Sequence, residues 1–138
     1  MTTTEKLHQQ LPHTLRSTDF PALGEKYQGK VRDVYRQGDR LVLITTDRLS
    51  AFDHVLTTLP FKGDLLNQLA HFWFQKTGHI AKNHVLDKPD ACVTVAKRAE
   101  PYPIEFVVRA YLTGSLWRDY EKGTDPYSLK LPPGLRCV

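Results

Sequence analysis

The sequence is poor in the features that mark secreted, membrane-spanning or metal-binding small proteins. It has two cysteines in 138 residues, Cys92 and Cys137, and no CxxC pair, so we expect free thiols rather than a disulfide framework or a zinc site. No apolar run approaches the roughly 20 residues that cross a bilayer. The first twenty residues also lack the apolar centre of a secretory signal. We therefore expect a cytoplasmic protein that has no membrane partner.

Several well-known catalytic motifs are also missing. The six histidines show neither HxxxH nor HExxH spacing, and the sequence contains no Walker A, GxGxxG or GxSxG motif. We expect neither zinc nor histidine-based catalysis. A Ser–His–Asp triad is the alternative, and no GxSxG turn supports it. His71 is interpreted as a surface residue or a hydrogen-bonded packing residue.

Charge of one sign is only slightly in excess. Nineteen basic and fifteen acidic residues give a net charge of +4, and the basic residues are spread along the chain without a block. This distribution suits a site for phosphates or carboxylates better than a nucleic-acid-binding arm, so no nucleic-acid partner is expected. With 41% hydrophobic and 25% charged residues, the chain has the composition of a globular domain with one core.

The pattern of apolar residues predicts an α+β fold with an antiparallel sheet. After an N-terminal arm over residues 1–20, residues 25–46 alternate in the manner of strands around Gln37-Gly38-Asp39, which predicts a β-hairpin. Residues 47–61 combine turn residues with a short apolar run. Adjacent strands with one long helix favour an antiparallel sheet over a Rossmann-type alternation.

A long helix is predicted to begin at Asp64 and to end before Gly78. Asp64 is a candidate N-cap, and Gly78 is a residue type that favours a helix end. The apolar cluster Phe72-Trp73-Phe74 predicts core packing.

Further elements are predicted in the second half of the chain. Strands are expected over residues 84–87, 92–97 and 104–109. A short helix that has Ser115 as its N-cap and Gly123 as its terminator should follow.

Two segments combine charged residues with turn chemistry. In Gly29-Lys30-Val31-Arg32-Asp33, glycine permits close approach of a ligand, and Lys30 and Arg32 share one sheet face on which they can meet phosphate oxygens. The alternative is a solvated face of an edge hairpin. In residues 46–53 (TDRLSAFD), Ser50 and Asp53 follow a strand, where loops present functional groups, or they serve as local caps of a charged turn.

A third candidate site lies around Arg109. This arginine ends an apolar strand, and a helix that begins at Ser115 aims backbone N–H groups at an anion, as phosphate sites do. The alternative is an ion pair between Arg109 and Glu105 on a solvated strand face.

Taken in order, these segments resemble a known family. The motifs GKVRDVY, TDRLSAFD, LPFKGDLLNQLAHFWF, PIEFVVRAYLTGS and KLPPGL, between about Leu23 and Arg136, are similar to those of the SAICAR synthetase family of purine biosynthesis. The resemblance implies a SAICAR synthase-like fold, in which an antiparallel β-sheet lobe packs against a helix. Such a lobe is similar to the small lobe of protein kinases and to ATP-grasp folds. It also implies an arm over residues 1–22, a nucleotide-binding lobe over residues 23–99, and the start of a second lobe over residues 100–138. We expect this second lobe to be largely missing from the chain.

The resemblance further implies the reaction and its site. Enzymes of this family use ATP and Mg²⁺ to join L-aspartate to carboxyaminoimidazole ribonucleotide, and release ADP and phosphate. By this resemblance, Arg109 and Asp53 are catalytic, and the substrate-binding residues are Arg109, Ser115, Ser50 and Asp53. The implied ATP-binding residues are Gly29, Lys30, Val31, Arg32, Lys97, Arg98 and Glu100, the last three at a hinge over residues 95–100 whose backbone holds adenine.

One departure from the family limits what the resemblance implies. The second family signature, D-x-K-x-E-F-G, whose acidic residues help to bind Mg²⁺, does not occur in this sequence. The metal ligands are therefore expected outside this chain, in a C-terminal part. Two alternatives stay open beside the ligase: a non-catalytic module that binds a nucleotide or phosphate, and a small basic RNA-binding domain.

Overall fold

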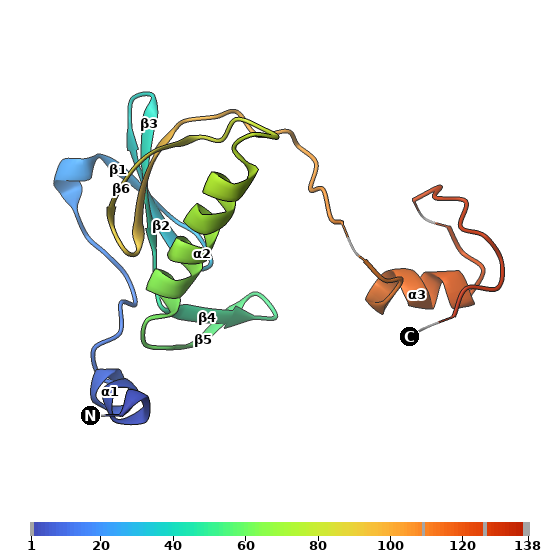
Figure 1. Ribbon diagram of the computed structural model, residues 1–138, viewed down its shortest axis with the longest axis horizontal. Coiled ribbons are helices and arrows are strands. Elements are labelled where there is room, and N and C mark those ends of the chain that lie inside the picture. Colours follow the sequence, from blue (N-terminus) through green and yellow to red (C-terminus); the bar gives the residue numbers. More distant parts are fainter. Residues whose placement is uncertain (1, 109, 126, 137–138) are drawn as a thin grey trace. The chain divides into compact units, whose positions relative to one another are not determined.

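The computed structural model describes residues 2–108, 110–125 and 127–136, which fall into two compact units, Met1–Glu100 and Pro101–Val138. The first unit holds a five-stranded antiparallel sheet, a separate two-stranded hairpin and two α-helices (Figure 1). The sheet strands are β1 (Glu25–Gln28), β2 (Arg32–Gln37), β3 (Arg40–Thr45), β6 (Val85–Asp90) and β7 (Val93–Lys97), in the order β1-β2-β3-β7-β6. The predicted α+β class with an antiparallel sheet is confirmed.

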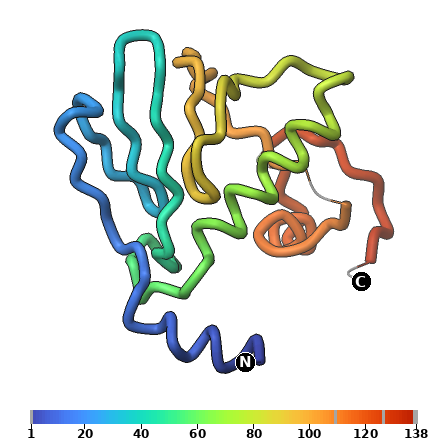
Figure 2. The backbone as a smooth tube through the Cα atoms, turned by 60° about the vertical axis from the view of Figure 1, so that its left-hand side comes forward, coloured from blue at the N-terminus to red at the C-terminus, as the bar shows by residue number. Residues whose placement is uncertain are grey.

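The hairpin predicted around Gly38 forms the centre of the sheet. Strands β2 and β3 pair from Gln37 with Arg40 to Arg32 with Thr45, and Gly38 has the positive φ of 56° that a tight turn needs. Alternation places Tyr35 opposite Val42, and both are buried with Ile44 in the apolar core. In Figure 2 the turn of this hairpin extends beyond the other strands.

The N-terminal arm begins as a helix and continues as an anchored segment. Helix α1 (Thr3–Gln10) starts with a capping box between Thr2 and Glu5, and the 3₁₀ turn η1 (Pro21–Leu23) leads into β1. Between them, the Leu15 N–H donates to Asp47 and the Thr18 N–H donates to Asp33. These bonds attach the arm to strand β2, which contains Asp33, and to the link after β3, which contains Asp47.

The hairpin of β4 (Arg48–Ala51) and β5 (His54–Thr58) precedes helix α2 (Lys62–Thr77), which lies along one face of the sheet (Figures 1 and 2). The helix begins two residues before Asp64, so the N-cap prediction is wrong. Phe61 is the N-cap, with a left-handed backbone of φ 62°, and the carboxylate of Asp47 accepts the Gly63 N–H at 2.9 Å. The first turn of α2 is thus capped by a residue that lies 16 positions earlier.

The face that α2 presents to the sheet is polar. Its buried residues are Gly63, Asn67 and His71, whereas the side chains of Phe72 and Trp73 are exposed. The prediction that Phe72 and Trp73 pack in the core is therefore wrong. The Asn67 side-chain amide donates to the Ala91 carbonyl between β6 and β7, and the His71 Nε2 is hydrogen-bonded to Thr94 on β7, which offsets the cost of burying these groups.

The second unit contains helix α3 (Gly114–Glu121) followed by loops. Thr113 is its N-cap, with an extended backbone and no side-chain cap bond, so the N-cap prediction for Ser115 is wrong. Gly123 follows the helix with a φ of 69°, as a terminating glycine does. Residues 104–108 form no strand, and the last residue of the predicted strand, Arg109, lies outside the described residues. No helix in the described part of the chain is long and apolar enough to cross a membrane.

Candidate functional site

The first predicted segment forms a tight turn between β1 and β2. The Gly29 N–H donates to the Arg32 carbonyl at 2.8 Å, and the Val31 carbonyl accepts the backbone N–H and the hydroxyl of Thr46, both at 2.9 Å. Lys30 lies in this turn and not on the strand, so strand alternation does not place it on one face with Arg32. Both side chains are nevertheless exposed at the same end of the sheet.

The structure brings this turn together with the second predicted segment. The Lys30 Nζ lies 2.5 Å from the Asp53 Oδ1, an ion pair between residues 23 positions apart. Asp53 and Phe52 form the turn of the β4–β5 hairpin, both with positive φ, at 62° and 51°. The hydrogen bond and charge of Lys30 lower the pKa of the Asp53 carboxyl. A cation and a carboxylate thus meet at an exposed position where a ligand can exchange with either.

Ser50 lies beside this turn on the hairpin itself. It is half-buried on β4, opposite Val55, next to a bulge between Leu49 and Ser50. The bulge alters the local direction of the strand, as bulges near functional sites do. The substrate-binding role of Ser50 stays a prediction.

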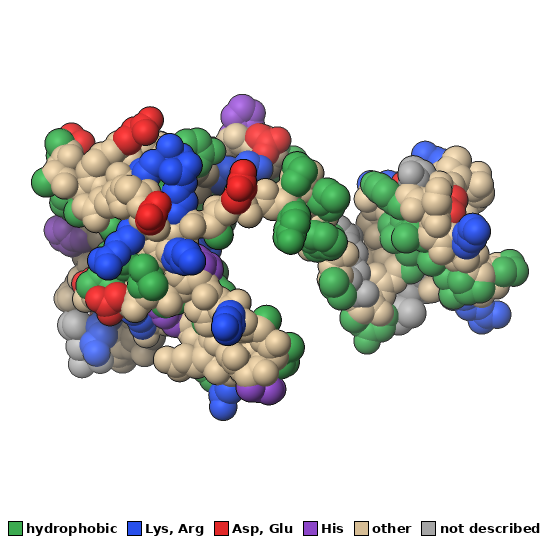
Figure 3. Space-filling model, turned by 90° about the horizontal axis from the view of Figure 1, so that it is seen from above, with side chains coloured by type: hydrophobic (Ala, Val, Ile, Leu, Met, Phe, Trp, Pro, Cys, Tyr) green, Lys and Arg blue, Asp and Glu red, His purple; other side chains and the backbone are tan. Residues whose placement is uncertain are grey.

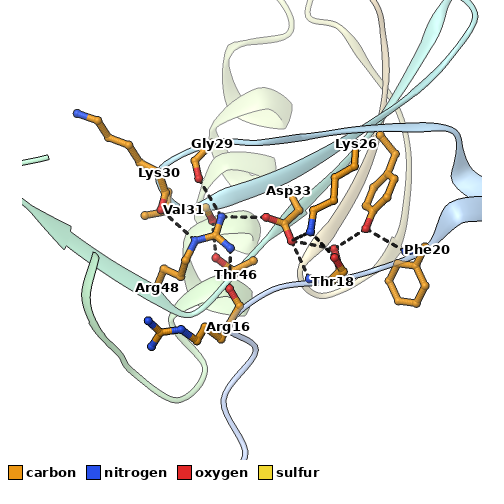
Figure 4. Close-up of polar contacts among 11 residues, drawn as sticks. Arg16, Thr18, Phe20, Lys26, Gly29, Lys30, Val31, Asp33, Thr46 and Arg48 are labelled. Carbon is orange, nitrogen blue, oxygen red and sulfur yellow. Dashed lines mark hydrogen bonds and ion pairs between the residues drawn. The ribbon is translucent and has the colours of Figure 1, made fainter. Parts of the chain in front are cut away.

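A buried cluster of charges lies directly behind the Gly29–Val31 turn (Figure 4). The Arg48 guanidinium donates to the carbonyls of Gly29 and Lys30, both at 3.0 Å, and to the Asp33 carboxylate at 3.0 Å. The Arg48 and Asp33 side chains are only 2% and 0% exposed. Sequence reasoning treated residues 46–53 as a charged surface turn, so it missed that Arg48 faces inward.

Asp33 is held in its charged form by several donors. Burial alone would raise the pKa of this carboxyl, but hydrogen bonds from Thr18, Arg48 and Lys26 lower it below its ordinary value. The Thr18 N–H and hydroxyl lie 2.7 and 2.9 Å from Oδ2, and the Lys26 Nζ lies 3.2 Å away. The carboxylate therefore balances two cations in the interior of the unit.

The predicted hinge residues lie at the opposite end of the sheet from the turn of Gly29. Strand β7 ends at Lys97, whose N–H donates to the His84 carbonyl, and the Arg98 N–H donates to the Asp39 carbonyl, both at 2.8 Å. The side chains of Lys97 and Arg98 are exposed and line an open depression of about 680 Å³ together with Lys82 and His84. Glu100 is the last residue of the first unit and is also exposed.

The residues implied to bind the ribonucleotide fall in the second unit. Ser115 is exposed in the first turn of α3, and Arg109 lies outside the described residues. The proposed pairing of Arg109 with an anion at this helix is therefore a prediction.

One cluster in the first unit has metal-ligand composition. The carboxylates of Asp64 and Asp90 and the thiol of Cys92 place one ligand atom each within 4.8 Å of the others. Burial, with the charges of Asp90 and Asp64, raises the pKa of the Cys92 thiol to about 11. A protonated thiol is a poor partner for Mg²⁺, which prefers oxygen ligands, so this cluster does not fit the magnesium of the resembled family.

The remaining charges are distributed over the surface. On the face shown in Figure 3, Lys and Arg side chains alternate with Asp and Glu side chains over the first unit. On this face, the mixture is unlike the continuous basic stripe of nucleic-acid-binding proteins.

Comparison with known proteins agrees with the motifs. The sequence profile of the family described as SAICAR synthetase matches residues 25–137. A phosphoribosylaminoimidazole-succinocarboxamide synthase of Legionella pneumophila (strain Paris) is 47% identical in an alignment 131 residues long, which covers 91% of this chain and 42% of that protein. A chloroplastic enzyme of the same name from Arabidopsis thaliana is 48% identical, over 89% of this chain and 31% of that protein.

Solved structures give the same result for the fold. A SAICAR synthase of Saccharomyces cerevisiae in complex with SAICAR superposes with a TM-score of 0.80 at 29% identity, over 88% of this chain and 49% of that one. A type-2 SAICAR synthetase in complex with ADP superposes with a TM-score of 0.59 at 28% identity, over 68% of this chain and 42% of that one. The chain spans less than half the length of these relatives. On the family profile and these identities, the chain belongs to the SAICAR synthetase family.

Proposed function

We propose that this chain forms the nucleotide-binding part of an ATP-dependent carbon–nitrogen ligase. The ligase joins L-aspartate to the carboxylate of carboxyaminoimidazole ribonucleotide and yields SAICAR, ADP and phosphate. The observation that carries the proposal is the braced Gly29–Val31 turn, which presents Lys30 at an exposed edge beside Asp53. The relative solved with ADP, which shares this fold, supports the same assignment.

The chemistry explains why such a site needs cations. A carboxylate is a poor acyl donor because its leaving group would be oxide. Transfer of the γ-phosphoryl group of ATP to a carboxylate oxygen makes a mixed anhydride and releases ADP; the aspartate amine then forms the amide bond, loses a proton and displaces phosphate. Lys30 and Arg32 offset the negative charge of the phosphates, and most of the catalysis is positioning and electrostatic stabilisation.

The other roles in the proposal rest on the motif positions. Arg109 and Ser115 hold the ribonucleotide at its phosphate or carboxylate, and Ser50 and Asp53 lie beside the reacting groups. The hinge residues Lys97, Arg98 and Glu100 lie at the adenine. We assign no Mg²⁺ ligand to this chain, and we assign the protein to the cytoplasm.

The proposal is tested by binding and turnover measured on the whole chain. Isothermal titration calorimetry with ADP and MgCl₂ should give a measurable affinity for wild type. Lys30→Ala and Arg32→Ala should each weaken it by about tenfold, the effect expected from losing one charge-assisted hydrogen bond. Lys6→Ala is the matched control, because it removes the same charge from the exposed surface of helix α1, outside both the turn and the hinge. Equal effects of Lys6→Ala and Lys30→Ala would contradict the site.

Turnover separates the ligase from a non-catalytic module. ATP, aspartate and carboxyaminoimidazole ribonucleotide are added together, and phosphate and SAICAR are measured. Production of both shows that the chain is a ligase by itself, whereas ADP binding without either product limits the activity of the chain alone to nucleotide binding.

A further inference from the structure

The guanidinium of Arg48 occupies a central place among main-chain carbonyls. Its Nε donates to the Lys30 carbonyl and its Nη2 to the Gly29 carbonyl, both at 3.0 Å, while its Nη1 donates to the Arg16 carbonyl at 2.6 Å (Figure 4). These acceptors come from the N-terminal arm and from the turn between β1 and β2. One side chain therefore ties the turn to the interior of the unit.

Asp33 fixes the guanidinium in this position. Its Oδ1 accepts the second Nη2 bond of Arg48 at 3.0 Å, and its Oδ2 is held by Thr18 and Lys26. Arginine has the planar fork of donors that this arrangement uses, whereas the ammonium of lysine is a point charge that cannot reach four separated acceptors. The geometry is therefore specific to arginine.

The direction of the two carbonyls determines the direction of the neighbouring N–H groups. In a trans peptide the C=O and the following N–H point to opposite sides. Since the Gly29 and Lys30 carbonyls point inward to Arg48, the Lys30 and Val31 N–H groups point away from it. Successive N–H groups directed to one side form the concave arrangement that binds phosphate oxygens in other proteins.

Stability alone does not account for a buried ion pair at this place. A well-packed apolar pair of similar volume often stabilises a fold as well as a buried ion pair does. An apolar side chain at position 48 would leave the Gly29 and Lys30 carbonyls without these donors, and the turn could then rotate its peptide planes. The charged pair thus fixes an orientation that packing alone would not.

We propose that Arg48, held by Asp33, is a positioning residue that orients the Gly29–Val31 turn for a nucleotide phosphate. The ligand part of this proposal rests on the proposed nucleotide-binding function. Arg48 itself is buried behind the turn, so it acts through the turn and not by touching the phosphate.

Hydrogen exchange of backbone amides tests the positioning role on the whole chain. The reporters are the Gly29 amide, bonded to Arg32, and the Thr46 amide, bonded to Val31. In Arg48→Lys both should exchange about tenfold faster, the effect of losing charge-assisted hydrogen bonds, while the amides of the β2–β3 ladder keep their rates. Arg40→Lys is the matched control and should change neither set. The proposal would be overturned if the exchange rates of the Gly29 and Thr46 amides did not change. It would also be overturned if the amides of the β2–β3 ladder were accelerated by the same factor.

A second variant removes the fully buried pair and leaves only Lys26, whose side chain is 26% exposed, without its carboxylate. The double substitution Asp33→Asn with Arg48→Met removes both charges and keeps the side-chain volumes similar. We expect the same local acceleration at Gly29 and Thr46. If neither variant folds, the test uses the Nε–H groups of the wild-type arginines. The Arg48 Nε–H should exchange with solvent as slowly as the Gly29 amide. If it exchanged as fast as the Nε–H of the exposed Arg40, the proposal would be overturned.

Titration with ADP and MgCl₂ tests the ligand part separately. In Arg48→Lys the affinity for ADP should fall about tenfold relative to wild type. If the Gly29 and Thr46 amides exchanged faster in Arg48→Lys but the affinity for ADP did not change, the role of the turn in phosphate binding would be overturned. If wild type itself binds no ADP, the proposed function fails, while the exchange rates still decide whether Arg48 orients the turn.

Discussion

Gly63 lies where helix α2 approaches the end of strand β3, and its replacement by alanine gives a sharp test of that packing. A Cβ at this position would lie 2.3 Å from the Thr45 carbonyl oxygen and 3.0 Å from its carbon. Both atoms belong to the main chain, so the helix and the strand would have to move apart. That movement would also stretch the 2.9 Å bond from the Gly63 N–H to Asp47.

The expected net cost is a balance of two effects. Overpacking against main-chain atoms costs about 3 kcal/mol, at the upper end of the usual range. Alanine recovers about 1 kcal/mol relative to glycine through helix propensity. We therefore expect Gly63→Ala to lower the free energy of unfolding by about 2 kcal/mol, where an ordinary helical site would show a gain.

Urea denaturation followed by far-ultraviolet circular dichroism measures this balance. Gln68, exposed on the same helix, provides the control pair Gln68→Gly and Gln68→Ala, in which alanine should be the more stable by about 1 kcal/mol. A Gly63→Ala protein that is as stable as wild type, or more stable, would refute the close approach of α2 to β3.

Asp47, His71 and Cys92 give three further predictions. The Asp47 carboxylate accepts the N–H groups of Leu15 and Gly63, and in Asp47→Asn the side-chain amide would point its own N–H toward one of these donors. The substitution should lower the free energy of unfolding by about 1–3 kcal/mol, measured by urea denaturation. An unchanged midpoint of the urea transition would contradict the capping role of Asp47. Burial, helped by Lys88 and His84, lowers the pKa of His71 below 6.5. The unfolded chain therefore takes up a proton that the folded chain does not, and stability should fall as the pH drops below about 6.5, less so in His71→Gln. If the two proteins showed the same pH dependence, His71 would not be the group responsible. With its pKa raised to about 11, Cys92 in a Cys137→Ser background should react with iodoacetamide at pH 7.5 about 100-fold more slowly than in the denatured chain, and equal rates would contradict its burial.

The local pattern of the sequence was enough to predict the elements that depend on local chemistry. Alternation around Gly38 predicts the β2–β3 hairpin, and the spacing of apolar residues predicts the long helix. The helix ends before Gly78, as predicted, although Gly78 has a right-handed backbone with a φ of −59°. Cys92 is a free thiol, as expected. Of the two positions that the sequence left open for His71, the structure shows the hydrogen-bonded packing residue and not the surface residue.

The buried face of α2 could not be predicted because it depends on distant partners. The Thr94 hydroxyl donates to the Asn67 Oδ1 at 2.7 Å, so the His71 Nε2 must donate to Thr94 at 2.8 Å. This three-residue network makes a polar helix face the buried one. Periodicity in the helix alone points to the apolar stripe instead, which is the stripe that contains Phe72 and Trp73.

The candidate site shows the same division. The motifs around Lys30 and Asp53 are visible in the sequence, but their meeting across 23 residues depends on the β4–β5 turn. Asp47 and Arg48 are expected at the surface because charged residues are rarely buried. Their burial follows from long-range bonds to the N-terminal arm and to the Gly29–Val31 turn, which no local pattern encodes.

In the proposed function, the Gly29–Val31 turn binds the phosphates of a nucleotide. This binding is tested by titrating the isotope-labelled chain with ADP and MgCl₂ while the backbone amide resonances are followed. We expect the largest shifts, which saturate with ADP, at Lys30 and Val31, and smaller shifts at Asp53. Saturable shifts that leave these residues unchanged, or a spectrum that ADP does not alter, would contradict it.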